Sequence, residues 1–554
     1  MAACIYYHPE AYSTNRPKLM GRNAAGESFL RGFIKYGTSG EFWVQVEKKE
    51  HAQHFADTLL ALGGNKPIKF INHQNLNDLA LPGVCYFPGP GIGENAWHRS
   101  FFGHEAWSLC GITHTTSSAR AMSAISDFIT SPLQPWDSLI CTSSAVKDNV
   151  ERLLQAQVDY LKDRLGITKL VLPQLPVIPL GIHTDDFAFT VDQKHLARQR
   201  IGADSGTLVV LFMGRLSFHA KAHPLAMYQA IEAAAITTGK KILLIECGWH
   251  SNEAIAKSFA EARSLACPNV RAVTLDGRNA EDRLTSWASA DVFCSLSDNI
   301  QETFGIVPIE AMAAGLPVVV SDWDGYKDTV RDGVDGFRVP TTMPHGGLGK
   351  DLAMRHALEI DTYDRYCGHT SSLVGVDIEL ATQAFVKLFK SSDLRRKMGQ
   401  AGQQRAREVY DWRNIIPQYE KLWATQHEIR NSLEGQLKKL AHPWPARMDP
   451  LSGFGSYPTQ QLNNDSQIII SAQNLNAALD RVKSYRNLTM VNFADYVLPS
   501  DDEVKQILNA AINQRPAIEL VSGFSEERKP FVFRSLAWLV KLGVLRVLKS
   551  ASHL

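Results

Sequence analysis

Short apolar runs alternate with amphipathic stretches over residues 1–428 of the chain. Typical apolar runs are FWVQVE, TLVVLFMGR, KILLIECG and PVVVSD, each of strand length and rich in β-branched residues. Strands that are apolar throughout are usually buried on both faces, and parallel strands need a helical crossover between them. The alternation therefore predicts an α/β protein built from parallel sheets covered by helices.

Two polar stretches interrupt this alternation. The first is DDFAFTVDQKHLARQRIGADSG, after which a new buried strand begins at Thr207. It predicts a linker between an N-terminal Rossmann-like domain, residues 1–190, and a C-terminal one, residues 205–395. The second is HPWPARMDPLSGFGSYPTQQLNNDSQ, whose prolines, glycines and polar residues are typical of a linker. Residues 431–554 are accordingly predicted to form a linker and an accessory domain.

The accessory domain has its own helical pattern. Residues 502–519 predict a helix and a turn, and residues 531–549 predict an amphipathic helix, a turn at Gly543 and a short strand. This order resembles, loosely, a small, mostly helical winged-helix module. A packing or oligomerisation role is the plainer interpretation. Binding to nucleic acid, to a protein partner, to the rest of the chain or peripherally to an anionic membrane surface remains open.

Charge and cysteine content exclude some classes of protein. The chain has 58 Lys and Arg against 57 Asp and Glu, a balance that argues against nucleic acid as a bulk partner. We find no long apolar run of the kind that spans a membrane and no signal-like N-terminus. The 8 cysteines are scattered without a C-x-x-C pair, which favours reduced thiols in a cytoplasmic protein.

The segment SLSDNIQETFGIVPIEAMAAGLPVVVSD contains the most informative motif. Glu302 and Glu310 are spaced E-x7-E, with TFG directly after the first carboxylate. If the intervening residues are helical, the two carboxylates lie roughly 12 Å apart along the axis, about the span from a sugar to a ribose across a folded diphosphate. Carboxylates accept hydrogen bonds from sugar hydroxyls, and amides that open a helix favour a diphosphate.

A second motif, FMGRLSFHAKAHP, follows a predicted buried strand. It places Gly214, Arg215 and Lys221 at the carboxyl edge of a parallel sheet, where α/β folds bind ligands. Two cations there would stabilise the charge on a departing nucleoside diphosphate without a metal ion.

Together these motifs resemble the retaining glycosyltransferases of family 4, which have the GT-B fold of two facing Rossmann-like domains. The resemblance also rests on GRNAAGESFL, DSLICTSSAVKD, IPLGIHTDDF and DLRRKMGQAGQQRAREVYDWRNIIPQYEKLW. It implies a helix in residues 396–430 that crosses back to the N-terminal domain. It also implies a donor bound mainly by residues 205–395 and an acceptor bound mainly by residues 1–190.

The resemblance implies a role for each candidate residue. Glu302 would contact the donor sugar, Glu310 the donor ribose, and Arg215 and Lys221 the diphosphate. The remaining implied residues are His114 facing the sugar, Gly214, the backbone amides of Phe304, Gly305 and Ile306, and Gly26 in a turn near phosphate and acceptor. The expected partners are a UDP- or GDP-sugar donor and a glycan, lipid or small-molecule acceptor. No cofactor and no metal are expected.

The sequence also departs from the family pattern. The step from Arg215 to Lys221 is longer than usual, so His219 or His223 could share the role of the lysine. Asp322-Trp323-Asp324 has the form of a metal-binding D-x-D, but its position after a buried strand argues against that role. The alternatives left open are an epimerase or phosphorylase on the same fold, a sugar-nucleotide-binding protein without turnover, and a nucleic-acid-binding regulator.

Overall fold

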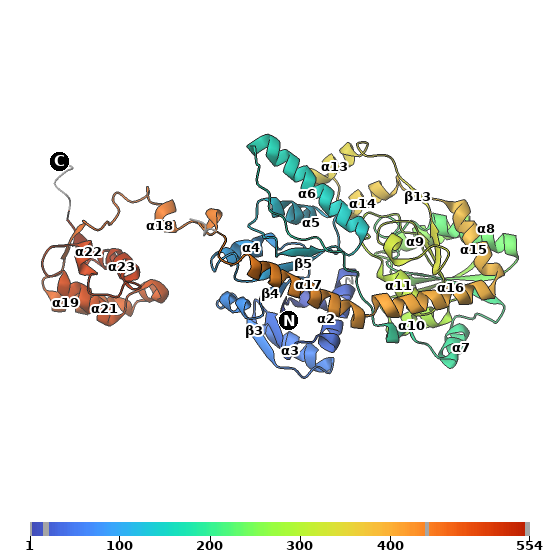
Figure 1. Cartoon of the computed structure of the whole chain (residues 1–554), viewed down its shortest axis with the longest axis horizontal. Helices are drawn as coiled ribbons and strands as arrows, with labels where there is room; N and C mark the ends of the chain where they lie inside the picture. Colours follow the sequence, from blue (N-terminus) through green and yellow to red (C-terminus); the bar gives the residue numbers. More distant parts are fainter. Residues whose placement is uncertain (1–2, 15–20, 438–441, 549–554) are drawn as a thin grey trace. The chain divides into compact units, whose positions relative to one another are not determined.

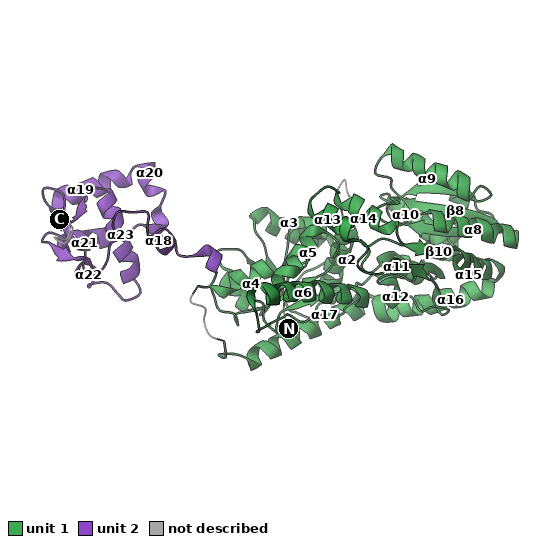
Figure 2. Ribbon diagram, turned by 90° about the horizontal axis from the view of Figure 1, so that it is seen from above, with its two compact units in different colours: residues 1–444 green, residues 445–554 purple. Residues whose placement is uncertain are grey.

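The computed structural model describes residues 3–14, 21–437 and 442–548. The chain forms two compact units, residues 1–444 and 445–554, coloured separately in Figure 2. All 8 cysteines are buried free thiols, as predicted. Among the described residues, no helix combines the length and the apolarity required to cross a membrane.

The first half of unit 1 is a six-stranded parallel sheet with the order β3-β2-β1-β4-β5-β6. Pairing places Cys4 opposite both Trp43 and Cys85, so β1 lies at the centre. The strands are β1 (Cys4–Tyr6), β2 (Phe42–Gln45), β3 (Ile68–Ile71), β4 (Val84–Tyr86), β5 (Ser108–Ile112) and β6 (Ser138–Ile140). The helices are α1 (Pro9–Tyr12), α2 (Gly21–Tyr36), α3 (Lys49–Ala61), α4 (Gly93–Ser100), α5 (Ala119–Ser126) and α6 (Ser144–Leu165), with 3₁₀ turns at Leu76–Ala80 and Asp127–Ile129.

Helix α6 shows how local sequence sets these elements. The hydroxyl of Ser143 accepts a hydrogen bond from the Val146 amide and caps the helix, which ends at Gly166 in the left-handed conformation. Its buried residues recur every three or four positions and form one apolar face; they are Val146, Val150, Leu154, Val158 and Leu161.

The second half repeats the architecture with the strand order β12-β11-β10-β7-β8-β9. The strands are β7 (Thr207–Met213), β8 (Lys241–Gly248), β9 (Arg271–Asp276), β10 (Val292–Ser295), β11 (Val318–Ser321) and β12 (Gly336–Val339). The helices are α8 (Leu225–Thr238), α9 (Glu253–Ala266), α10 (Ala280–Ser289), α11 (Ile306–Ala313), α12 (Tyr326–Thr329), α15 (Ile378–Lys390) and α16 (Ser392–Arg405). The predicted α/β fold with two Rossmann-like halves is thus confirmed.

An excursion leaves this half after β12. The short strands β13 (Thr341–Thr342) and β14 (Gly375–Val376) pair antiparallel at its base. Between them lie α13 (Lys350–Ala357) and α14 (Tyr363–Ser371), helices that the sequence pattern did not predict.

The polar stretch between the halves is more ordered than a linker. It holds a 3₁₀ turn, Thr184–Phe187, and helix α7 (Val191–Arg200), which packs on α10. Thr190 and Gln193 form a capping box at its start, and Arg198 pairs with Asp291 at 3.0 Å. Because polar contacts and a cap hold this helix, with only Ala197 buried, hydrophobic periodicity gave no sign of it.

The return to the first half occurs at residues 406–412. Helix α16 stays on the second half, a π-helical turn spans Ala406–Tyr410, and α17 (Trp412–Ser432) packs on α2, β4 and β5 (Figure 1). Only the last part of the predicted 396–430 segment therefore crosses back. This returning segment pairs with the segment around Ile182, where the chain first leaves the first half. The Ile182 amide donates to the Tyr410 carbonyl at 2.8 Å, and the Trp412 amide donates to the Ile182 carbonyl at 3.1 Å.

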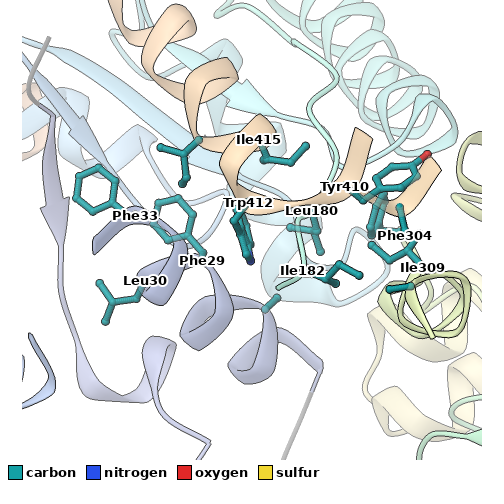
Figure 3. Packing of buried hydrophobic residues seen from close by; sticks show 14 of the residues in the cluster. Phe29, Leu30, Phe33, Leu180, Ile182, Phe304, Ile309, Tyr410, Trp412 and Ile415 are labelled. Atoms are coloured by element: carbon teal, nitrogen blue, oxygen red, sulfur yellow. The ribbon is translucent and has the colours of Figure 1, made fainter. Parts of the chain in front are cut away.

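Trp412 fills the space where these two segments meet. Figure 3 shows its ring with Phe29 on one side and Leu180 and Ile182 on the other. A Cβ on Gly32 or Gly181 would lie 2.6 or 2.5 Å from the Trp412 ring, so both glycines are required for this close approach. One continuous apolar core runs from α2 through Trp412 to Phe304 and Ile309 of the second half.

Unit 2 has a three-stranded antiparallel sheet with β15 (Gln467–Ile470) between β16 (Arg515–Pro516) and β17 (Leu545–Val547). Its helices are α18 (Pro450–Gly453), α19 (Leu475–Arg486), α20 (Thr489–Asn492), α21 (Asp501–Ala510), α22 (Ala517–Leu520) and α23 (Lys529–Lys541), with 3₁₀ turns at Pro445–Arg447 and Asp495–Val497. The predicted order of helix, Gly543 and strand is confirmed. Residue 549, the last residue of that predicted stretch, lies outside the described residues. The winged-helix resemblance stays a prediction.

Candidate active site

A cavity of about 490 Å³ lies where the two halves of unit 1 face each other. The carboxyl ends of β5, β7, β8 and β10 open toward it, the position at which parallel α/β sheets bind ligands. Nine of the ten predicted site residues line it. They are His114, Gly214, Arg215, Lys221, Glu302, Phe304, Gly305, Ile306 and Glu310.

Glu302 and Lys221 form an ion pair in the wall of this cavity, with side chains 11% and 20% exposed. Burial opposes ionisation of Glu302, but the Lys221 ammonium and the amides of Thr303 and Phe304 outweigh it, so the pKa of Glu302 is lowered. Glu302 is therefore a carboxylate at neutral pH, and Lys221 is held beside it.

The turn that carries Glu302 precedes the helix. Gly305 has a φ of +84°, and α11 begins only at Ile306. A Cβ at Gly305 would lie 2.0 Å from the Tyr326 ring, so only glycine fits the turn. The helical spacing expected between Glu302 and Glu310 is therefore wrong for its first half. In addition, the Thr303 and Phe304 amides hydrogen-bond to the Glu302 carboxylate, so the Phe304 amide points at a side chain of the protein.

Arg215 projects from the end of β7. Its guanidinium donates to the Ala220 carbonyl at 2.8 Å and to the side-chain oxygen of Gln301. The loop between Arg215 and Lys221 folds back, so that a Cβ on Gly214 would lie 3.4 Å from Lys221 Cε. Although Arg215 and Lys221 are six residues apart in the sequence, the fold of this loop places both cations in the same wall of the cavity.

The two histidines considered as substitutes for Lys221 lie elsewhere. The His219 carbonyl accepts from the Asn299 side chain at 3.0 Å, and the His223 amide donates to Asp298 at 3.2 Å. Neither residue lines the cavity. Lys221 is thus the residue of this loop that places a cation beside Glu302.

Glu310 lies on α11 and also lines the cavity. Burial raises its pKa to about 7, an effect that Arg283 opposes and Asp186 adds to. A carboxyl with a pKa near neutrality is poised to ionise when hydroxyl donors bind to it.

The first half contributes His114, on the loop after β5. Burial, and secondarily the charge of Arg22, lowers the pKa of this half-buried histidine to about 4. The ring is therefore neutral at pH 7 and can donate one hydrogen bond and accept another. Its carbonyl accepts from the Thr303 hydroxyl at 3.3 Å, which joins the two halves at the cavity.

Gly26 is the exception among the predicted residues. It lies inside α2, buried against α1, and a Cβ there would be 1.9 Å from the Ala11 carbonyl oxygen. The glycine permits close helix packing and does not reach the cavity. Residues that precede it on α2 line the wall instead: Gly21, Arg22, Ala24 and Ala25.

Asp322 and Asp324 face different partners. Arg338 pairs with Asp322 at 3.4 Å, whereas Asp324 accepts from the Ser143 hydroxyl of the first half at 3.3 Å. Burial raises the pKa of Asp324, and the charge of Glu302 adds to the effect. This arrangement supports a role in interdomain contact.

Among the cavity-lining residues that sequence reasoning missed, two make hydrogen bonds that shape the site. The side-chain oxygen of Gln301 accepts a hydrogen bond from Arg215. Gln301 directly precedes Glu302 in the E-x7-E segment, so its place in the sequence was a signal that it lies near the site. Tyr363 on α14 places its hydroxyl 2.9 Å from Ser117 Oγ and 3.2 Å from Thr115 Oγ1, across the cleft. It belongs to the unpredicted excursion after β12, so no motif pointed to it.

The two facing Rossmann-like halves and the cleft between them define the GT-B fold. A family model described as glycosyl transferases group 1 matches residues 193–346, the part of the chain that carries Arg215, Lys221, Glu302 and Glu310. Among solved structures, that of the Anabaena protein HepE in complex with UDP has a TM-score of 0.50 at 16% identity and covers 77% of this chain and 100% of HepE.

Curated relatives match parts of the chain. One is phosphatidyl-myo-inositol mannosyltransferase of Mycobacterium leprae, 33% identical over 138 residues, which are 25% of this chain and 27% of that protein. Another is D-inositol 3-phosphate glycosyltransferase of Xylanimonas cellulosilytica, 27% identical over 208 residues, which are 37% of this chain and 45% of that protein. The chain thus spans less than half the length of either relative.

Proposed function

We propose that this chain is a metal-independent, retaining glycosyltransferase of family 4 that transfers a sugar from a nucleotide-sugar donor to an acceptor. The observation that carries the proposal is the convergence of two cations, Arg215 and Lys221, with two carboxylates, Glu302 and Glu310, in one cavity between the halves. A nucleoside diphosphate sugar presents a diphosphate and two sets of hydroxyls, and these four side chains match its charges and hydrogen-bonding groups.

The residues have separate tasks in this reaction. Arg215 and Lys221 bind the diphosphate and stabilise the negative charge that grows when the bond between the sugar C1 and the phosphate oxygen breaks. Glu302 accepts from the sugar hydroxyls, and Glu310 from the ribose. The neutral His114 hydrogen-bonds to the sugar from the first half. The acceptor oxygen bonds to C1 on the face that the diphosphate leaves, and its proton passes to the leaving phosphate oxygen.

We propose a UDP- or GDP-sugar as donor and a glycan, lipid or small molecule as acceptor, with no resident cofactor. The names of the relatives, which are inositol-directed glycosyltransferases and mannosyltransferases, support a hydroxyl acceptor. HepE, the structural neighbour, binds UDP.

The test is a panel of UDP-, GDP- and ADP-sugars, read by thermal shift and by analysis of the products. We expect one donor class to raise the melting temperature and to yield a new glycoside with the anomeric configuration of the donor when an acceptor is supplied. The folded Arg215→Ala variant serves as the control. An epimerised donor or a free sugar phosphate would overturn the assignment in favour of another GT-B enzyme. Binding without any turnover would favour a sugar-nucleotide-binding protein.

A further inference from the structure

Two histidines and a glutamate converge on the first half of unit 1, outside the cavity. His8 follows β1 and Glu47 follows β2, and these two strands pair with Tyr6 opposite Gln45. Each residue therefore lies two positions beyond a paired residue at the same edge of the sheet. His51 lies in the first turn of α3. One ligand atom from each of the three residues lies within 4.8 Å of the other two.

The contacts of His51 show that this group is not a closed hydrogen-bond network. The Nδ1 atom of His51 is buried and has no hydrogen-bond partner. Its ring lies 4.6 Å from the His8 ring, centroid to centroid, at an interplanar angle of 71°. A buried polar atom without a partner is unfavourable, and a metal ion bound there would satisfy it.

The Glu47 carboxylate is also held near the two imidazoles. The Tyr6 hydroxyl donates to Glu47 Oε1, which leaves Oε2 free of that bond. Hydrogen bonds of this kind from outside the ligand set orient ligating carboxylates in metal sites. The exposed side chain of Glu47 can also rotate toward the two imidazoles without disturbing the core.

We propose that His8, Glu47 and His51 bind a zinc ion. Two imidazole nitrogens and one carboxylate oxygen are a zinc ligand set, and three protein ligands leave a fourth tetrahedral position for water. Tetrahedral ligands with bonds of roughly 2.0–2.1 Å lie about 3.3 Å apart, so the side chains move together when the ion binds.

The ion also changes one existing contact. The Glu10 amide donates to His8 Nδ1 at 3.2 Å and caps α1, a helix of four residues. A zinc-bound imidazole carries its proton on the other ring nitrogen, so the ion displaces this hydrogen bond. In exchange, the ion joins the start of α3 to the end of β1. None of the three ligands lines the cavity, so the site is independent of the transfer reaction.

The test uses the full chain without a histidine tag, freed of metal with a chelator and titrated with Co²⁺ as a visible probe and then with Zn²⁺. We expect one ion per chain, a Co²⁺ spectrum of tetrahedral type that Zn²⁺ abolishes, and a higher melting temperature with Zn²⁺. Glu47→Ala changes an exposed side chain, so it should fold normally and bind Zn²⁺ at least tenfold more weakly. His51→Ala should lose the spectrum.

His54→Ala is the matched control. His54 lies one turn further along α3, where its Nδ1 is 2.7 Å from the Tyr7 hydroxyl, and the variant should bind Co²⁺ as the parent does. The proposal is overturned if the parent chain binds no Co²⁺ or Zn²⁺. It is equally overturned if Glu47→Ala and His51→Ala, both folded by circular dichroism, bind as tightly as His54→Ala.

Discussion

The two walls of the cavity differ in how their side chains are held. In the second half, Lys221 pairs with Glu302, and Arg215 donates to Gln301. Opposite them, the first half contributes small or apolar residues of α2 and Leu180, together with four polar residues: Arg22, His114, Thr115 and Ser118. One wall is preorganised by its own ion pair and hydrogen bonds. The other is shaped by helix packing and touches its partner through a few hydroxyl groups.

On the proposed function, this difference gives the walls distinct tasks. Preorganised charges stabilise a developing charge without reorganisation at the moment of reaction, so the second half is suited to the leaving diphosphate. A wall made of a helix start and loops is easily varied, and it is suited to select an acceptor. Variants of residues in each wall test whether the two walls have these different tasks.

The largest effect is expected from the charged wall. Arg215→Ala and Glu302→Ala should each lower kcat roughly 10²–10³-fold, because on the proposed function each removes a group that contacts the donor in the transition state. Steady-state kinetics, with circular dichroism to confirm folding, measures it. Arg22→Ala, an arginine removed from the opposite wall, is the control and should leave donor affinity within tenfold of the parent. Equal loss of donor affinity in Arg22→Ala and Arg215→Ala would erase the contrast between the walls.

The helix-built wall should respond in stability. Gly26→Ala places a Cβ against the Ala11 carbonyl and should lower the free energy of unfolding by about 1–3 kcal/mol. Gly21→Ala is the matched control, since a Cβ there meets nothing within 4 Å. Chemical denaturation compares the two. A stable Gly26→Ala protein with impaired transfer would instead return Gly26 to the site.

The pH dependence of donor binding tests Glu310. Burial raises its pKa to about 7 in the free protein. On the proposed function, the ribose hydroxyls bind the carboxylate more tightly than the protonated carboxyl, because the carboxylate is the stronger acceptor. Donor affinity should therefore be about tenfold weaker at pH 6 than at pH 8, as titration calorimetry would show. Glu310→Gln should abolish this dependence. Asp298 also has a pKa raised by burial to about 7, and Asp298→Asn should retain the dependence. The opposite pattern would move the titration to Asp298.

A smaller effect is expected where the walls touch. Tyr363→Phe removes a hydroxyl that lies within hydrogen-bond distance of Ser117 and Thr115 and should raise KM about fivefold, the equivalent of one hydrogen bond of about 1 kcal/mol. The value of kcat should change less. An unchanged KM would mean that these bonds add nothing to closure of the cleft.

Sequence reasoning succeeded where the signal is local. The continuous apolar runs of β7, β8 and β11 predicted buried strands, which the structure has. The motifs that follow such runs contain Arg215 and Glu302, which lie in the cavity wall, while their roles stay predictions. It failed where the answer depends on distant contacts. Whether Gly26 faces a ligand or a neighbouring helix is set by how α2 packs on α1. Helix α7 depends on a salt bridge to Asp291, and Tyr363 reaches the cleft on an excursion with no periodicity of its own.

The paired crossing segments have a consequence for how such genes can be recombined. Ile182 pairs with residues 410–412, and the Thr184 hydroxyl donates to Asp411 at 2.5 Å. The first half is therefore completed by α17, which follows the second half in the sequence. Its packing partners are therefore encoded in two separated stretches. Exchange of the first half of unit 1 between homologous genes requires three junctions, near codons 182, 411 and 432. A single crossover would pair one protein's α2 with another protein's Trp412.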